Sequence, residues 1–204
     1  MYIMARYSTA HKQATRQRIL AASDRLLKGL GPEGASVEAV MREAGLTVGG
    51  FYVHFASKDE LTREGLLYGV EASFARLTRG LDHLDGRPFL AALIERYLAQ
   101  ACDAGLGDAC PLTLLLPEVA RSDDAFRLRF AECTAALLAE VEGRFPAVPG
   151  MARRDVALAV FAALSGAVAM ARATPAPRAQ ARIAAATEAL LARAFGLEAE
   201  SGKA

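Results

Sequence analysis

The segment 36–61 constrains the fold of this 204-residue chain more than any other part of its sequence. Ser36 can cap the first turn of a helix through its hydroxyl group. Behind it, four apolar residues recur at helical spacing: Val37, Val40, Met41 and Ala44. Gly45 follows where the chain has to turn, because glycine adopts positive φ without steric cost. With a second short helix at about 48–54, the pattern predicts a helix-turn-helix, a motif whose second helix enters the major groove of DNA.

The second of these helices has an inner and an outer face. Phe51 and Phe55 are four residues apart and should both point into the core, so Tyr52 points toward solvent or DNA. Gly49 and Gly50 would each cost about 1 kcal/mol against Ala in a helix interior. Near the start of a helix they instead allow the backbone close to a phosphate or a base edge. Directly behind, residues 57–60 (Ser-Lys-Asp-Glu) form a capping box that opens a third helix.

The sequence of residues 47–61, together with Arg-Gln-Arg-Ile-Leu-Ala-Ala upstream, resembles the DNA-binding signature of the TetR/AcrR family of bacterial transcriptional regulators. The resemblance is close over about residues 10–62. It implies an all-α protein that binds a palindromic operator in double-stranded DNA as a homodimer and is released by a small-molecule effector. It implies no cofactor.

The resemblance also assigns roles to single positions. Those that match DNA-contacting positions of the family are Thr47, Gly49, Tyr52, His54 and Lys58, with Tyr52 and Lys58 acting mainly on phosphate. Val48 and Gly50 match positions that face base edges, and Ser36 caps the helix behind them. Val37, Glu38 and Val48 depart from the family, since many members have Thr, Arg or Lys there. The chain therefore has few side chains able to hydrogen-bond to bases, which gives backbone approach, phosphate contacts and DNA shape a larger part in specificity.

Basic residues gather near the N-terminus, although the formal net charge is only +1. Residues 1–30 hold six basic side chains and one acidic side chain. Lys12 and Arg16 lie one helical turn apart and are the best candidates for phosphate contacts. The alternative is a solvated helix face.

The rest of the chain is predicted to be helical, with no convincing strand. The first helix runs from about Lys12 to Lys28 and ends at a cluster of glycines, with Ser23, Leu26 and Leu30 among its inward residues. We predict two domains: an N-terminal arm with the DNA-binding module at 1–57, and a helical effector-binding and dimerisation domain at 58–204. A long helix from 58 to about 81 links them. The composition fits a cytoplasmic protein, and we find neither a signal peptide nor a hydrophobic run long enough for a bilayer.

The last two helices carry the predicted homodimer interface. Residues 156–171 contain no charge, and a helix that is apolar all round has to be buried on every side. The next helix, 178–195, places apolar or small residues on one stripe: Ile183, Thr187, Leu190, Leu191 and Ala194. In the TetR-like family such a pair forms a four-helix interface with its twofold mate. The alternative is the core of a monomer.

The middle helices, about 89–145, are the candidate effector domain. Tyr97, Leu112, Leu116 and Phe130 are among the residues that could line an apolar cavity, and ordinary core packing is the alternative for each. Cys110 precedes Pro111 at the start of a helix, where the helix dipole would favour a reactive thiolate. The alternatives for Cys110 are a redox or electrophile sensor and a small buried apolar residue.

Other functional classes lack their motifs. Three cysteines without paired spacing and three scattered histidines predict neither a disulfide framework nor a metal site. Phosphate-loop, zinc-protease and nucleophile-elbow patterns are absent, so we expect no enzyme. The sequence therefore predicts a homodimeric, effector-responsive transcriptional regulator, most simply a repressor. The alternative is a helical small-molecule or redox-binding protein of the same fold that does not regulate transcription.

Overall fold

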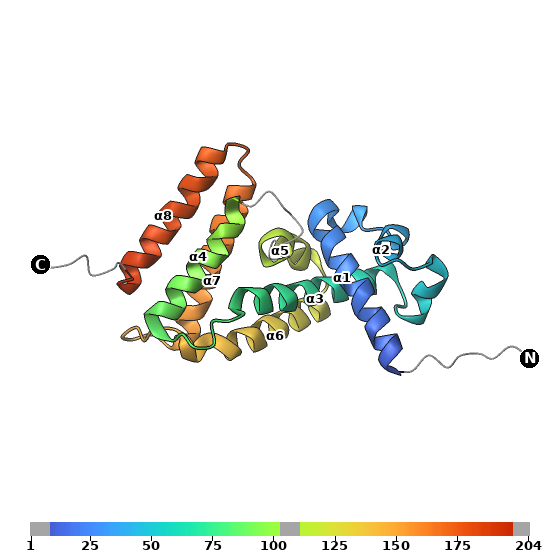
Figure 1. Cartoon of the computed structure of the whole chain (residues 1–204), viewed down its shortest axis with the longest axis horizontal. Helices are drawn as coiled ribbons and strands as arrows, with labels where there is room; N and C mark the ends of the chain where they lie inside the picture. Colours follow the sequence, from blue (N-terminus) through green and yellow to red (C-terminus); the bar gives the residue numbers. More distant parts are fainter. Residues whose placement is uncertain (1–8, 103–110, 198–204) are drawn as a thin grey trace, which may run out of the picture. The chain divides into compact units, whose positions relative to one another are not determined.

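The computed structural model describes residues 9–102 and 111–197 and confirms an all-α fold, with no strand in those two ranges (Figure 1). The elements run in the order α1 (Thr9–Gly34), α2 (Val37–Glu43), η1 (Val48–Val53), α3 (Lys58–Thr78), α4 (Gly86–Cys102), α5 (Pro111–Arg121), α6 (Asp124–Val141), η3 (Glu142–Arg144), α7 (Arg153–Arg172) and α8 (Pro177–Phe195). The two short elements η1 and η3 are 3-10 helices. The chain divides into two compact units, Met1–Val70 and Glu71–Ala204. The division falls inside α3, whereas the predicted domain boundary lies just before that helix.

The first unit contains α1, α2, η1 and the first part of α3. Helix α1 is interrupted at Gly31, whose φ of 71° and ψ of 177° are not helical. The break ends the regular periodicity one residue after Leu30, which is exposed. The prediction that Leu30 faces inward was therefore wrong, because it extended the helical stripe up to the kink. Ser23, another residue of that stripe, is buried as predicted.

The turn between α2 and η1 is held by backbone and side-chain caps. At the start of α2, the Ser36 hydroxyl accepts a hydrogen bond of 3.2 Å from the Ala39 N–H. At its end, Gly45 has a φ of 68°, and its N–H donates to the Arg42 carbonyl. The Leu46 N–H donates to the Met41 carbonyl at 2.8 Å, which completes a Schellman motif. Two carbonyl groups at the end of α2 are thus satisfied within the turn that connects α2 to η1.

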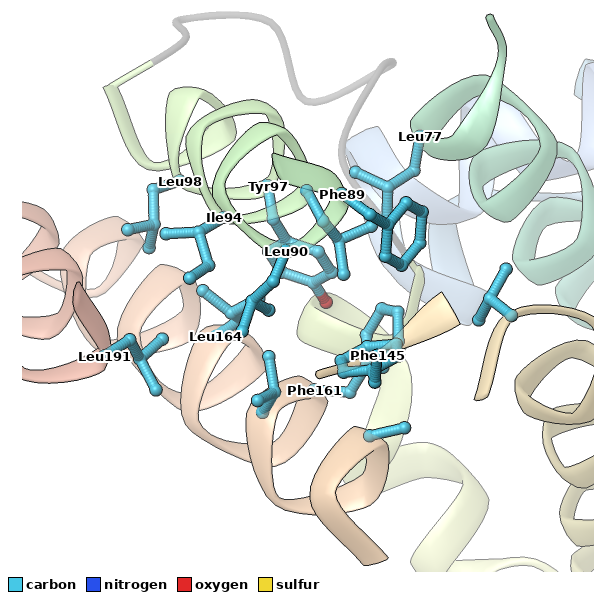
Figure 2. Packing of buried hydrophobic residues seen from close by; sticks show 14 of the residues in the cluster. Leu77, Phe89, Leu90, Ile94, Tyr97, Leu98, Phe145, Phe161, Leu164 and Leu191 are labelled. Atoms are coloured by element: carbon cyan, nitrogen blue, oxygen red, sulfur yellow. The ribbon is translucent and has the colours of Figure 1, made fainter. Parts of the chain in front are cut away.

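The second unit is built around α4, α7 and α8, which pack side by side (Figure 1). Helices α5 and α6 pack against α7. One apolar core joins these helices, with Phe89 and Phe145 in edge-to-face contact at 5.6 Å between ring centroids. Tyr97 and Phe161 make a second edge-to-face pair at 6.0 Å (Figure 2). The apolar segments that form α4, α7 and α8 therefore pack into one core in this unit.

Two arginines bind carbonyl groups at the end of α3 and in the loop that follows it, within the second unit. Arg96 donates to the carbonyls of Leu77 and Arg79, at 3.2 and 2.7 Å. Arg144 donates to the carbonyls of Leu81 and Leu84 and lies 4.2 Å above the Phe89 ring centroid. The last carbonyls of a helix lack partners within the helix and carry its negative dipole end, so Arg96 stabilises the end of α3. Arg144 instead holds the loop that follows this helix.

Helix α7 is long and apolar enough to cross a membrane when judged by length and composition alone. Half of its most apolar stretch is buried inside the protein, as expected of a core helix. The buried residues include Val160, Leu164 and Val168, which belong to the core of the second unit. The prediction of burial on every side was wrong for the single chain, because Leu158 and Met170 are exposed.

Candidate nucleic-acid interface

The predicted reading helix is η1, and its inner side is anchored by two phenylalanines. Phe51 and Phe55 are both buried and stack with their ring centroids 5.8 Å apart, as the sequence predicted. Thr47 occupies the capping position with extended backbone, but its side chain makes no capping hydrogen bond. Its hydroxyl group is therefore not used to start the helix.

The outer side of η1 presents three large side chains to solvent. Tyr52 is 76% exposed, Val53 60% and Val48 42%. The Tyr52 ring lies edge-on against Phe51, 5.0 Å between centroids, so the core supports its orientation. A Cβ atom built at Gly49 would meet nothing within 4 Å, and Gly50 would meet only the Met41 methyl at 3.9 Å. The protein's own packing therefore does not require either glycine.

His54 directly follows η1, beside two basic residues of α1. Burial lowers the pKa of His54 first, and the positive charges of Lys12 and Arg16 lower it further. Its Nδ1 atom is buried without a hydrogen-bond partner. Arg16 lies 4.5 Å above the Phe55 ring centroid and 3.7 Å from a carboxylate oxygen of Glu64. The structure thus places Lys12 and Arg16 near the end of the reading helix.

The start of α3 belongs to the same unit. The Ser57 hydroxyl accepts a hydrogen bond of 3.0 Å from the Glu60 N–H, while the Glu60 carboxylate accepts one of 2.6 Å from the Ala56 N–H. The predicted capping box is therefore present, with the carboxylate one residue further back than in the standard pattern. Lys58 sits exposed in the first turn, so its ammonium group can reach a ligand outside the protein.

Other basic residues of α1 have structural partners instead. Arg18 donates to the Ala44 carbonyl at 2.7 Å, and Arg25 pairs with Glu43 at 3.0 Å. Lys28 is fully buried and lies 2.7 Å from a carboxylate oxygen of Asp24. The surplus of positive charge in residues 1–30 is thus partly used in internal contacts. The contacts of Arg18 and Arg25 were not predicted because their partners, Ala44 and Glu43, lie in another helix region, whereas Asp24 and Lys28 are neighbours one turn apart within α1.

The second unit contains a cluster of hydroxyl groups in its apolar core. The Tyr97 hydroxyl lies 2.7 Å from the Ser165 Oγ and 3.5 Å from the Thr113 Oγ1. Tyr97 comes from α4, Thr113 from α5 and Ser165 from α7. Sequence reasoning named Tyr97 but missed the two smaller residues. The one available signal was a single serine inside the uncharged run 156–171.

The remaining effector candidates do not converge on one point. Leu112 is partly buried against the apolar core of the second unit. Phe130 of α6 is also buried, but it is not part of that apolar core. Leu116 is exposed, so the chain itself does not enclose it. Cys110 lies outside the described residues. Cys133 packs its sulfur 3.9 Å from a Glu71 oxygen; burial first and this carboxylate next raise the pKa of its thiol. No group of three potential metal ligands occurs in the described ranges.

Comparison with known proteins gives a consistent result. The profile of the family described as bacterial regulatory proteins, tetR family, matches residues 19–64. No curated protein matches the chain. A TetR transcriptional regulator from Chloroflexus aurantiacus is 22% identical with a TM-score of 0.65, over 91% of this chain and 98% of that one.

Two further solved structures resemble the chain to a similar degree. A TetR-family regulator from Cytophaga hutchinsonii is 21% identical with a TM-score of 0.67, over 89% of this chain and 95% of its own. The reduced form of NemR from E. coli is 20% identical with a TM-score of 0.65, over 85% and 95%. These likenesses show that the fold is shared along both units.

Proposed function

We propose that the chain, which carries the tetR-family DNA-binding region, is a DNA-binding transcriptional regulator. In detail, it would be a cytoplasmic homodimeric repressor that an effector releases from a palindromic operator. The observation that carries the proposal is the family match over residues 19–64 on a unit whose reading helix exposes Tyr52 and Val48. We retain 1–57 as the DNA-binding domain, with the effector-binding and dimerisation domain at 58–204.

The proposed DNA contacts lie on the first unit. Lys12, Arg16, Tyr52 and Lys58 would contact phosphates, which set register and orientation on the duplex. Thr47, Val48 and Gly49 start the reading helix, where a helix-turn-helix contacts base edges. Gly50 and His54 complete this surface, and Ser36 holds it through its cap on α2.

Selection from a random pool of DNA duplexes tests this function. The intact protein should enrich a palindrome, and Tyr52→Ala with Lys58→Ala should weaken its affinity. Because both copies of a dimer lose their Lys58 contact, the slope of log affinity against log salt should also fall by about two. Arg127→Ala, an exposed charge removed from α6 and outside both proposed interfaces, is the matched control and should leave both quantities unchanged. Failure to enrich any sequence would favour a small-molecule or redox-binding protein that does not regulate transcription.

The proposed dimer interface is the outer side of α7 and α8. Four residues spaced four apart along α7 are all exposed: Leu158, Ala162, Gly166 and Met170. On α8 a comparable row is exposed: Arg182, Ala186, Leu190 and Ala194. Leu191 and Ile183, predicted on the same stripe as Leu190, pack inward on the chain's own core instead. Small residues between large apolar ones allow the helices of a second copy to approach closely, as ridges in grooves.

Oligomeric state tests the interface directly. Met170→Glu and Leu190→Glu should each shift a dimer toward monomer in sedimentation velocity, because a carboxylate would be buried without a partner. Leu128→Glu on α6 is the matched control, since Leu128 is similarly exposed but lies outside these two helices. A wild-type monomer at tens of micromolar, or equal effects of all three changes, would contradict the proposed interface.

The core of the second unit supports an uncharged effector. Among its described residues the buried polar ones are Ser73 and Thr113, and charged side chains that have buried atoms, such as Glu118 and Arg172, are only partly buried. Pro117 lacks an N–H and so cannot donate to the Thr113 carbonyl within α5. The Thr113 hydroxyl lies 3.5 Å from that of Tyr97, which in turn lies 2.7 Å from that of Ser165. A mainly apolar molecule with one hydrogen-bonding group would suit this place, whereas a bare charge would remain uncompensated.

A matched set of compounds tests that preference. We expect 2-naphthol to bind more tightly than naphthalene or 2-naphthoate in calorimetry, and Tyr97→Phe to reduce the advantage over naphthalene. Preferred binding of the carboxylate would contradict an uncharged effector. For the thiol-reactive alternative, a quinone should release DNA from the wild type but not from Cys110→Ser.

A further inference from the structure

We propose that Val48 determines operator specificity by reading the C5-methyl group of a thymine in the major groove. The inference rests on the proposed DNA-binding function and deepens it, because it names the chemical group that is read. Its basis is the combination of an exposed aliphatic side chain and two glycines that the protein's own packing does not require.

The chemistry of the exposed residues leaves few ways to read a base. Residues 47–53 are Thr-Val-Gly-Gly-Phe-Tyr-Val and contain no Arg, Lys, Asn or Gln, the side chains that form bidentate bonds with guanine or adenine. Phe51 is buried, and Tyr52 is the most exposed residue of the helix. An aliphatic side chain can recognise one major-groove feature specifically, the thymine methyl group.

Gly49 permits the close approach that such a contact needs. An apolar contact forms at about 4 Å between carbon atoms, so the helix backbone must come near the base edges. A side chain at 49 would extend into open space beside Val48 and would hold the duplex away. Neither a positive φ nor a crowded neighbour explains glycine at this position, which leaves an external partner as the physical reason.

Position along η1 decides which of its two exposed valines, Val48 or Val53, should contact a base. Val48 is the first residue of η1 and Val53 the last. In a helix-turn-helix the N-terminal residues of the reading helix contact base edges. Val48 should therefore face a base even though Val53 is the more exposed of the two.

Replacement of thymine by uracil tests the assignment, because uracil lacks only the methyl group. The intact protein would first enrich a duplex from a random pool, and that duplex would then be made with uracil at one thymine position at a time. Loss of one buried methyl group should weaken binding about fourfold, and about sixteenfold when both half-sites of a palindrome are changed. Positions without a methyl contact should show no change.

Three variants identify the residue responsible. Val48→Ala should weaken binding to the thymine duplex and reduce its preference over the uracil duplex, because the shorter side chain reaches the methyl group less well. Val53→Ala should keep the full thymine preference, and Leu30→Ala, an exposed apolar residue outside η1, should behave as wild type. Equal binding of the two duplexes by the wild type, or loss of the preference in Val53→Ala instead, would overturn the proposal. If no sequence is enriched, the DNA-binding function itself fails, and this proposal fails with it.

Discussion

The contact between Gly65 of α3 and Ser23 of α1 gives a prediction whose sign is decided by steric fit. A Cβ atom added at Gly65 would lie 2.4 Å from the Ser23 Oγ and 2.9 Å from the Ser23 Cβ. Gly29 in α1 offers the opposite case, since an added Cβ there would meet nothing within 4 Å. Both glycines are helical and both belong to the first unit, so one substitution can be compared in two environments.

The magnitudes predict opposite effects on the free energy of unfolding. Gly→Ala in a helix gains up to about 1 kcal/mol from backbone propensity, and Gly29→Ala should show this gain. At Gly65 the serine hydroxyl could rotate away, but the Ser23 Cβ is fixed to the backbone of α1, so the two helices must separate. Overpacking costs about 1–3 kcal/mol, and a clash with two atoms belongs near the top of that range. Subtracting the gain leaves Gly65→Ala destabilised by about 2 kcal/mol.

Urea unfolding followed by circular dichroism measures this difference, since the chain has no tryptophan for fluorescence. With m near 2 kcal/mol per molar, the two variants should differ in midpoint by about 1 M or more at unchanged m. Ser23→Gly combined with Gly65→Ala should recover most of the loss, as a favourable coupling in a double-mutant cycle. Equal midpoints for Gly65→Ala and Gly29→Ala would refute the reasoning that the contact is too close for a methyl group.

Three other changes in the first unit test its packing and electrostatics. Lys28→Met should destabilise by about 3–5 kcal/mol because it leaves the buried Asp24 without its ammonium partner, and Asp24→Leu with Lys28→Met should restore most of the stability in the same urea assay. Gly45→Ala should cost about 1–2 kcal/mol because its φ of 68° is strained for alanine, and Gly45→Asn should cost less. Burial, then Lys12 and Arg16, lower the pKa of His54, so below pH 6.5 the unfolded state holds more protons. Stability should therefore fall as the pH drops from 6.5 through the lowered pKa. His54→Gln should flatten this part of a midpoint-against-pH curve, and an unchanged slope would contradict the assignment.

The helix-turn-helix could be predicted in detail because its signals are local. Ser36, Gly45 and the Ser57–Glu60 pair each act on backbone groups within five residues of themselves, so their spacing in the sequence carries their geometry. The inward direction of Phe51 and Phe55 followed from one helical turn. The prediction that Leu30 faces inward failed, because helical spacing holds only as far as the helix extends and Gly31 interrupts it.

Contacts between distant residues could not be read in this way. The Tyr97 and Ser165 hydroxyls meet across 68 positions of sequence, and Arg18 reaches the Ala44 carbonyl across 26. Such pairs depend on how whole helices cross, which composition and period do not specify. The role of Tyr97 as an effector contact accordingly remains a prediction, as do those of the proposed DNA-contacting residues.

Helix α7 is not buried on every side in one chain, and its exposed side is the reason for proposing a second copy. An uncharged helix of this kind is stable in water only when all its sides are covered. The chain covers the side that carries Val160 and Leu164 and leaves the row from Leu158 to Met170 in solvent. Exposed apolar rows on adjacent α7 and α8 would cost less free energy if another surface removed them from water. A second copy presents two identical helices and can cover both rows at once through a twofold axis, and the same axis would pair two reading helices on a palindrome.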